Sequence, residues 1–148
     1  MTENEKLLKK LFAEKDFKPN DAQYRAITHI EGPLFLTAGP GSGKTRVLLW
    51  RTLNLIVFHN VQPNEIFLAT FTEKAALQLK EGLQGLLSIA SKYTHKPYDI
   101  AEMYVGTLHS LCQKLLRLII RLTLGLECLV KKVRRLIQLR TVFHSLTE

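Results

Sequence analysis

One segment of this chain restricts its fold more than any other, the run LFLTAGPGSGKTRVLLW between Leu34 and Trp50. The apolar stretch Leu34–Ala38 leads into a glycine-rich turn, and Lys44 and Thr45 open a second apolar stretch behind it. This order predicts a buried β-strand, a tight turn and a buried α-helix, which is the arrangement of a phosphate loop. The segment therefore indicates an α/β domain with a nucleotide site at the turn.

The residue types in this turn suit a bound polyphosphate. Glycines let the backbone N–H groups of a tight loop face phosphate oxygens, because a Cβ atom would obstruct them. The dipole of the following helix favours the same anion. A lysine at this place brings a positive charge to the β- and γ-phosphates, and a threonine hydroxyl is a ligand for Mg²⁺. The pattern A-x-x-x-x-G-K-T thus predicts a site for ATP and Mg²⁺, with Lys44 and Thr45 as catalytic residues and Thr45 as metal ligand. The predicted binding residues are Ala38, Gly39, Pro40, Gly41, Ser42, Gly43, Lys44 and Thr45.

Apolar runs and helical apolar periodicity alternate along the chain, which predicts parallel strands joined by helices. Asn20, with Gln23 three residues later, has the spacing of a helix capping box. The expected strands are Leu34–Ala38, Ile66–Phe71 and Met103–Thr107, and the expected helices cover 3–15, the segment after Asn20, Lys44–Phe58, Thr72 to about Ala90, and 107–120. The fold class that follows is α/β, a parallel sheet flanked by helices.

Composition limits the remaining possibilities. The formal net charge of the 148 residues is +8, but residues 113–148 alone hold eight Lys or Arg against two Asp or Glu. The basic character therefore belongs to the end of the chain, so it does not by itself indicate a polyanionic partner. The segment MTENEKLLKKLF lacks the apolar core of a signal peptide, and we expect a cytoplasmic protein. Cys112 and Cys128 have no metal-ligand spacing, and their leucine neighbours predict buried, reduced thiols.

Four stretches in order resemble motifs of the UvrD/Rep-like branch of superfamily 1 DNA helicases, over about residues 15–118. FKPNDAQYRAI resembles the Q motif, although Pro19 stands where a leucine is usual, and AGPGSGKTRVL resembles motif I. FLATFTEKAALQLKEGL and VGTLHSLCQKLLR resemble motifs Ia and Ib. The resemblance implies a partial RecA-like domain over residues 1–118, in which Gln23 reads the adenine edge and Arg46, directly after the threonine of motif I, is a further nucleotide-binding residue. It also implies contacts with single-stranded DNA from Phe71, Thr72, Lys74, Thr107, His109 and Ser110.

The sequence departs from that family after motif Ib. It contains no Asp-Glu pair of the kind that holds Mg²⁺ and orients water in the family's D-E-x-x motif, and Glu127 has the wrong spacing to replace it. A second RecA-like lobe with arginine fingers is not recognised either. We therefore expect an ATP-binding N-terminal fragment of a helicase, truncated after motif Ib and unable to unwind DNA alone. Residues 119–148 form either a basic, leucine-rich helical tail or a segment outside the family's reading frame.

Two other functions remain open at this point. A small phosphotransferase with a phosphate loop would need a catalytic acid and an arginine-rich lid, and neither is recognisable as a cluster. A nucleotide-gated nucleic-acid-binding module without catalysis would use the basic tail as its contact.

Overall fold

The computed structural model describes residues 3–123 and 140–142, which fall into two compact units. Unit 1 comprises residues up to Val61 together with Glu81–Asp99. Unit 2 comprises Gln62–Lys80 and the described residues from Ile100 onward. The division falls inside one long helix, α4 (Glu73–Thr94), so each unit contains a part of it.

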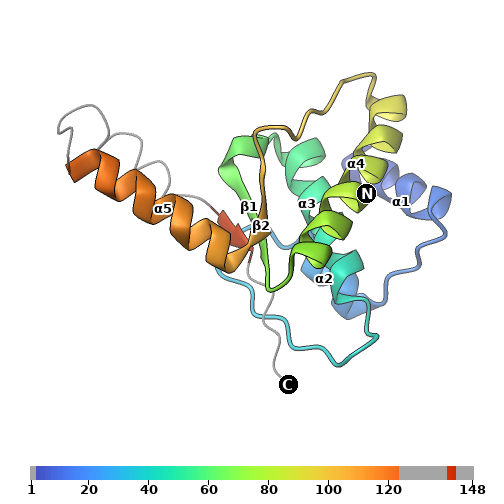
Figure 1. The fold of residues 1–148 in the computed structure, drawn as a ribbon. Coiled ribbons are helices and arrows are strands. Elements are labelled where there is room, and N and C mark those ends of the chain that lie inside the picture. The colour runs from blue at the N-terminus through green and yellow to red at the C-terminus, as the bar shows by residue number, and fades with distance from the viewer. Residues whose placement is uncertain (1–2, 124–139, 143–148) are drawn as a thin grey trace. The chain divides into compact units, whose positions relative to one another are not determined.

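Unit 1 is helical and is built around one aromatic cluster. Its helices are α1 (Glu3–Glu14), α2 (Asp21–Thr28), α3 (Lys44–His59) and the later part of α4 (Figure 1). The ring of Trp50 on α3 is 2% exposed and lies 4.7 Å from the ring of Phe12 on α1, edge to face. A cluster of this kind contributes more than its buried area alone, because aromatic pairs have a preferred geometry. As predicted from its apolar sequence, α3 is buried in its central part, where half of its 16 residues are buried, all between Val47 and Ile56.

Backbone carbonyls at the end of α2 accept hydrogen bonds from α3. Asn54 Nδ2 donates to the carbonyl of Ile27 at 3.2 Å, and Arg51 Nη1 donates to the carbonyl of Ala26 at 2.6 Å. These side chains satisfy carbonyls that have no partner within the helix itself. At the later part of α4, a Cβ added to Gly82 would lie 2.8 Å from Leu49 Cδ1, so a glycine permits this close approach to α3.

Unit 2 contains a small parallel sheet. Its elements are the 3₁₀ turn η1 (Pro63–Glu65), β1 (Ile66–Thr70), the start of α4, β2 (Tyr104–Thr107), α5 (Leu108–Thr123) and β3 (Arg140–Val142). The strand order is β2-β1-β3, and both pairs are parallel. The prediction of parallel strands joined by a helix is confirmed for β1, α4 and β2. Strands β1 and β2 begin and end within one residue of the sequence prediction.

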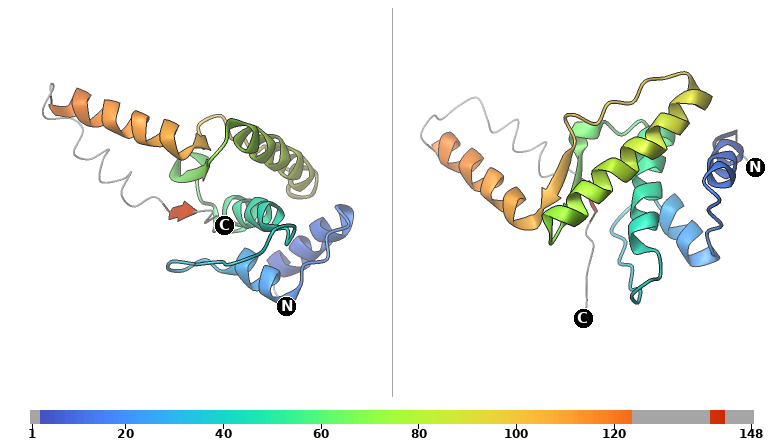
Figure 2. Two further views of the ribbon diagram at one scale, coloured as in Figure 1. Left: turned by 60° about the horizontal axis from the view of Figure 1, so that its bottom comes forward. Right: turned by 45° about the vertical axis from the view of Figure 1, so that its right-hand side comes forward.

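Helix α5 begins directly after β2 and extends away from the sheet of unit 2 (Figures 1 and 2). Its apolar side chains are consequently exposed, with Leu116 at 57% and Ile119 at 52%. Cys112 lies on this helix and is free and exposed, so the prediction of a buried thiol is wrong for it. Leucine neighbours predict burial only when another element covers the helix face that they share. Cys128 lies outside the described residues.

Two further expectations are corrected by the structure. Leu34–Ala38 forms no strand, and Phe35 within it is 74% exposed. An apolar run becomes a strand only when a neighbouring strand pairs with its backbone, and within the described part of the chain none does. Within the expected helical tail, residues 119–123 are helical as the end of α5, whereas Arg140–Val142 is a strand whose backbone pairs with β1. Residues 124–139 and 143–148 of the tail lie outside the described residues. No helix among those described is long and apolar enough to cross a membrane.

Candidate functional site

The glycine-rich turn in unit 1 has the backbone conformation that its sequence predicts. Gly41 and Gly43 have φ angles of 74° and 80°, in the left-handed region that other residues enter only with strain. Gly43 is also the N-cap of α3. Helix α3 therefore begins directly after the turn, and the N–H groups of its first residues have no partner within the helix.

The side chains of the turn are held by its own carbonyls. Lys44 Nζ donates to the carbonyl of Ala38 at 2.7 Å and to that of Gly39 at 2.9 Å. Ser42 Oγ donates to the same Gly39 carbonyl at 2.7 Å. These bonds bring the lysine ammonium back over the loop that precedes it, so the charge stays at the turn.

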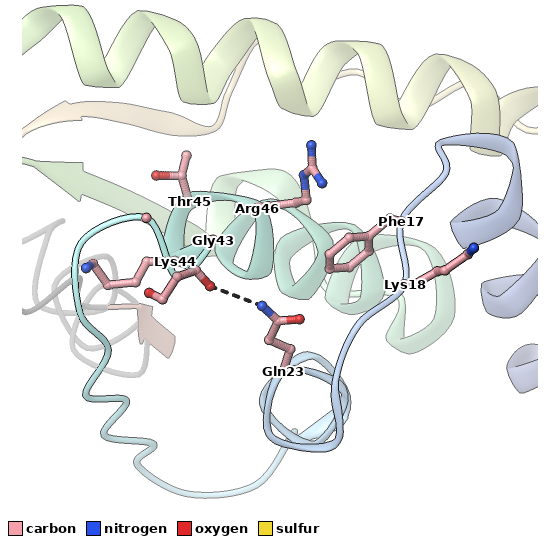
Figure 3. Close-up of a pocket in the computed structure, with 9 residues that line it drawn as sticks. Phe17, Lys18, Gln23, Gly43, Lys44, Thr45 and Arg46 are labelled. Carbon is pink, nitrogen blue, oxygen red and sulfur yellow. Dashed lines mark hydrogen bonds between the residues drawn. The ribbon is translucent and has the colours of Figure 1, made fainter.

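Gln23 connects α2 to the turn. Its backbone N–H donates to Asn20 Oδ1 at 2.9 Å and its Oε1 accepts from the backbone N–H of Asn20 at 3.0 Å, so the predicted capping box is confirmed. Its Nε2 donates to the carbonyl of Ser42 at 3.1 Å, the dashed line in Figure 3. A Cβ added to Gly43 would lie 3.4 Å from this Nε2, which shows how closely the amide meets the turn.

These residues line an open cavity of about 670 Å³. Seven of the predicted nucleotide residues line it, namely Gln23, Gly41, Ser42, Gly43, Lys44, Thr45 and Arg46. Ala38, Gly39 and Pro40 are not among the lining residues, although the first two hold Lys44 through their carbonyls. Unpaired N–H groups at a helix start and two cations, Lys44 and Arg46, suit a multiply charged anion.

Phe17 and Lys18 also line this cavity, and the sequence analysis did not select them. In Figure 3 the Lys18 side chain points away from the glycine-rich turn, whereas Phe17 lies beside Arg46 at the first turn of α3. The guanidinium carbon of Arg46 is 5.5 Å from the centre of the Phe17 ring. An aromatic residue a few positions before the capping box was the available indication, but an isolated aromatic is more often part of a core.

The second group of predicted residues lies in unit 2, where β1 and β2 end. Thr70 and Thr107 are paired in the register of these parallel strands, so the two strands end side by side. Phe71, Thr72 and Lys74 follow β1 and are exposed, with Phe71 at 62%. The structure therefore brings the two predicted nucleic-acid segments to one edge of the sheet. That edge, at the carboxyl ends of parallel strands, is where α/β sheets bind their ligands.

The two threonines at this edge are helix caps. Thr72 Oγ1 accepts from the backbone N–H of Ala75 at the start of α4, and Thr107 Oγ1 accepts from that of Ser110 at the start of α5, both at 3.2 Å. Thr107 is 8% exposed, so its hydroxyl is occupied within the protein. His109 is exposed and forms a 3.0 Å hydrogen bond with Gln113 one turn later. The accessible groups at this edge are therefore Phe71, Lys74 and His109, beside two capped helix starts.

The part of the chain that is similar to known proteins contains the candidate sites. The family model described as the UvrD/REP helicase N-terminal domain matches residues 19–139, which include both candidate sites except for Phe17 and Lys18. The chain belongs to this helicase family. The match also extends beyond residue 118, where the recognised motifs end.

The curated relatives of this chain are longer proteins, and the chain matches only a part of each. It is 40% identical over 97 residues to the putative ATP-dependent DNA helicase YjcD of Bacillus subtilis, which is 66% of this chain and 12% of that protein. It is 45% identical over 83 residues to the ATP-dependent DNA helicase SRS2 of Saccharomyces cerevisiae, 56% of this chain and 7% of that protein. It is 41% identical over 99 residues to the ATP-dependent DNA helicase PcrA of Leuconostoc citreum, 66% of this chain and 12% of that protein. The chain thus spans about an eighth or less of the length of these relatives.

Proposed function

We propose that this chain is the ATP-binding part of an ATP-dependent DNA helicase, that it binds ATP with Mg²⁺ at the glycine-rich turn of unit 1, and that it binds single-stranded DNA at the ends of β1 and β2. One observation carries the nucleotide assignment: Gln23, the turn Gly41–Gly43 and Lys44 line one cavity at the start of a buried helix. Membership of the helicase family supports both assignments.

In this proposal the turn binds the phosphates. The backbone N–H groups at the start of α3 donate to phosphate oxygens, and the helix dipole adds to the attraction. Lys44 exchanges the carbonyls of Ala38 and Gly39 for the β- and γ-phosphates. That exchange favours binding because a charge-assisted hydrogen bond to phosphate is stronger than one to a neutral carbonyl.

Gln23 keeps the capacity to read a base. An amide has two N–H donors and an oxygen with two lone pairs, and the contacts to Ser42 and Asn20 use one donor and one lone pair. One donor and one acceptor remain, which match the N7 acceptor and N6 donor of adenine. Guanine presents two acceptors at the same edge, so we expect ATP to be preferred over GTP.

Thr45 is the protein ligand that we assign to Mg²⁺. Its side chain is exposed in the cavity, and a hydroxyl oxygen is a suitable donor for this hard cation. None of the described residues that line the cavity is acidic. Mg²⁺ keeps several waters and accepts phosphate oxygens readily, so one protein oxygen is compatible with a bound ATP–Mg²⁺ complex.

At the strand ends of unit 2, the proposed partner is the backbone and bases of single-stranded DNA. The exposed ring of Phe71 offers a face for base stacking, and Lys74 offers a positive charge. The capped starts of α4 and α5 place helix dipoles at the same edge, where they favour phosphate groups. Binding of this kind has little sequence preference and weakens with salt.

Titration calorimetry of the full chain with ATP–Mg²⁺ tests the nucleotide assignment. We expect saturable binding that Lys44→Ala weakens by at least ten- to 150-fold, because a charge-assisted hydrogen bond contributes about 1.5–3 kcal/mol. Lys10→Ala is the matched control, since Lys10 is an exposed lysine of α1 outside the cavity. An unchanged Kd in Lys44→Ala would contradict the assignment, as would an equal loss in both variants.

A further inference from the structure

Phe17 connects the nucleotide cavity to the aromatic core of unit 1. The residue follows a turn in which Asp16 has a φ of 45°, and its backbone N–H donates to the carbonyl of Phe12 at 2.9 Å. Its side chain is 7% exposed, yet it lines the cavity. The ring is therefore part of the core and of the cavity wall at the same time.

The core fixes the orientation of this ring. It lies parallel to the ring of Trp50, with 7° between the planes and 5.7 Å between the centres. It also meets the edge of the Phe12 ring, at 5.4 Å and 81°. Two neighbours of different orientation leave a flat ring little freedom to rotate, so its faces keep fixed directions.

Arg46 lies over this fixed ring. It is four residues before Trp50 on α3, so both side chains leave the same face of the helix. Its guanidinium carbon is 5.5 Å from the Phe17 ring centre, within the range of a cation–π contact. Among residues 3–123 and 140–142, no acidic side chain forms an ion pair with Arg46, so the ring is the group that holds it.

We propose that Phe17 is a positioning residue of the nucleotide cavity. Its ring holds the Arg46 guanidinium at the cavity wall, two residues after Lys44, where the cation meets the bound nucleotide without first having to be ordered. Binding then loses less side-chain entropy, which is how a pre-ordered contact raises affinity. This inference depends on the proposed function, because it concerns the same cavity.

A double-mutant cycle in ATP–Mg²⁺ affinity tests this proposal on the full chain. Phe17→Met keeps an apolar side chain of similar volume but removes the ring, and we expect ATP–Mg²⁺ to bind about two- to five-fold more weakly. Arg46→Gln weakens binding at least as much, and the double variant binds about as weakly as Arg46→Gln alone, since Phe17 acts through Arg46. Phe17→Tyr keeps the ring face and retains wild-type affinity.

Leu83→Val is the control, because Leu83 is fully buried in unit 1 but does not line the cavity. It lowers the Tm and leaves the Kd for ATP–Mg²⁺ unchanged. Independent losses in the two single variants that multiply in the double variant would overturn the proposal, as would an equal loss of affinity in Leu83→Val. Arg46 is exposed, so Arg46→Gln remains informative even if Phe17→Met does not fold, and a wild-type Kd in Arg46→Gln also overturns the proposal.

The same titrations separate this proposal from the proposed function. If Lys44→Ala binds ATP–Mg²⁺ as well as the wild type, the nucleotide assignment itself fails. If Lys44→Ala loses binding while Phe17→Met keeps it, the cavity is a nucleotide site and only the role of Phe17 is wrong.

Discussion

The two candidate sites differ in how their side chains are used before any ligand is present. In the cavity of unit 1, Gln23, Ser42 and Lys44 all donate to backbone carbonyls of the same turn. At the sheet edge of unit 2, the threonines cap helices, whereas Phe71 and Lys74 are exposed. A cavity built from mutually bonded groups concentrates its binding energy in a few residues. An edge of separate exposed groups distributes it, so its affinity depends on salt and on several residues that contribute independently.

The largest expected effect concerns hydrolysis. We expect the full chain to bind ATP–Mg²⁺ without DNA-stimulated turnover, because no acidic side chain among residues 3–123 and 140–142 lines the cavity and the sequence holds no Asp-Glu pair. Arginine fingers alone account for about 10³–10⁵ in rate in related phosphoryl-transfer enzymes. Phosphate release with and without single-stranded DNA is the measurement. Turnover on the order of one per second or more, accelerated by DNA, would show that an acid from elsewhere in the chain reaches the turn.

The next largest expected effect is the loss of DNA affinity when the exposed Phe71 ring at the sheet edge is replaced. Phe71→Ala removes a stacking face and should weaken binding of an oligothymidylate by about 1–3 kcal/mol, which is roughly five- to 150-fold. Phe35→Ala is the matched control, since Phe35 is an even more exposed phenylalanine, at 74%, in unit 1. Fluorescence anisotropy at two salt concentrations measures both the loss and the salt dependence. Equal affinities for Phe71→Ala and the wild type would remove Phe71 from the proposed interface.

Gln23→Ala tests the interior bonding of the cavity. It deletes the Nε2 bond to Ser42 and the Oε1 bond to Asn20, each of which contributes about 0.5–1.5 kcal/mol. We expect a lower Tm, weaker ATP binding and a smaller ratio of ATP to GTP affinity. Gln84→Ala, at an exposed position of α4 in the same unit, is the control. A variant that loses stability but keeps the wild-type ATP-to-GTP ratio would reduce Gln23 to a structural cap.

The smallest expected effect is the loss of thermal stability when a capping threonine is replaced. Unit 2 offers two such residues for comparison, Thr107 and Thr72. Thr107→Val leaves the N–H of Ser110 without its partner in a buried environment, at a cost of about 1 kcal/mol, which corresponds to roughly 2–4 °C in Tm. Thr72→Val removes the equivalent bond to Ala75 at an exposed position, where water replaces it. Thermal unfolding should therefore show a larger shift for Thr107→Val. Equal shifts would mean that burial at Thr107 does not matter.

Local features of the sequence predicted most of what the structure contains. The capping box at Asn20 and the buried helix after Lys44 depend on neighbouring residues, and both are present. Features that depend on distant partners were missed. Leu34–Ala38 is as apolar as a strand but has no strand beside it in the described part of the chain. Cys112 has leucine neighbours, but it is exposed on a helix that no other described element covers.

Dependence on residues distant in the sequence also explains why the sequence predicted the nucleotide cavity only in part. The phosphate-loop pattern identified the turn, because the conformation of a tight turn depends on the glycines within it. Gly41 and Gly43 have positive φ angles, which glycine adopts without strain. Phe17 was missed because its importance arises from Trp50 and Arg46, which lie on α3 about thirty residues later in the sequence. Apolar periodicity predicts which side chains are buried. Which aromatic ring lies against a cation is visible only in the packed structure.

The most direct test of the central claim is a crystal structure of the full chain with Mg²⁺ and a non-hydrolysable ATP analogue. The account predicts phosphate oxygens within hydrogen-bonding distance of the backbone N–H groups of the turn Gly41–Gly43 and of Lys44 and Thr45 at the start of α3. It also predicts that Lys44 Nζ has left the carbonyls of Ala38 and Gly39 for these oxygens. An analogue bound elsewhere, or a lysine still bonded to both carbonyls beside an occupied cavity, would contradict it.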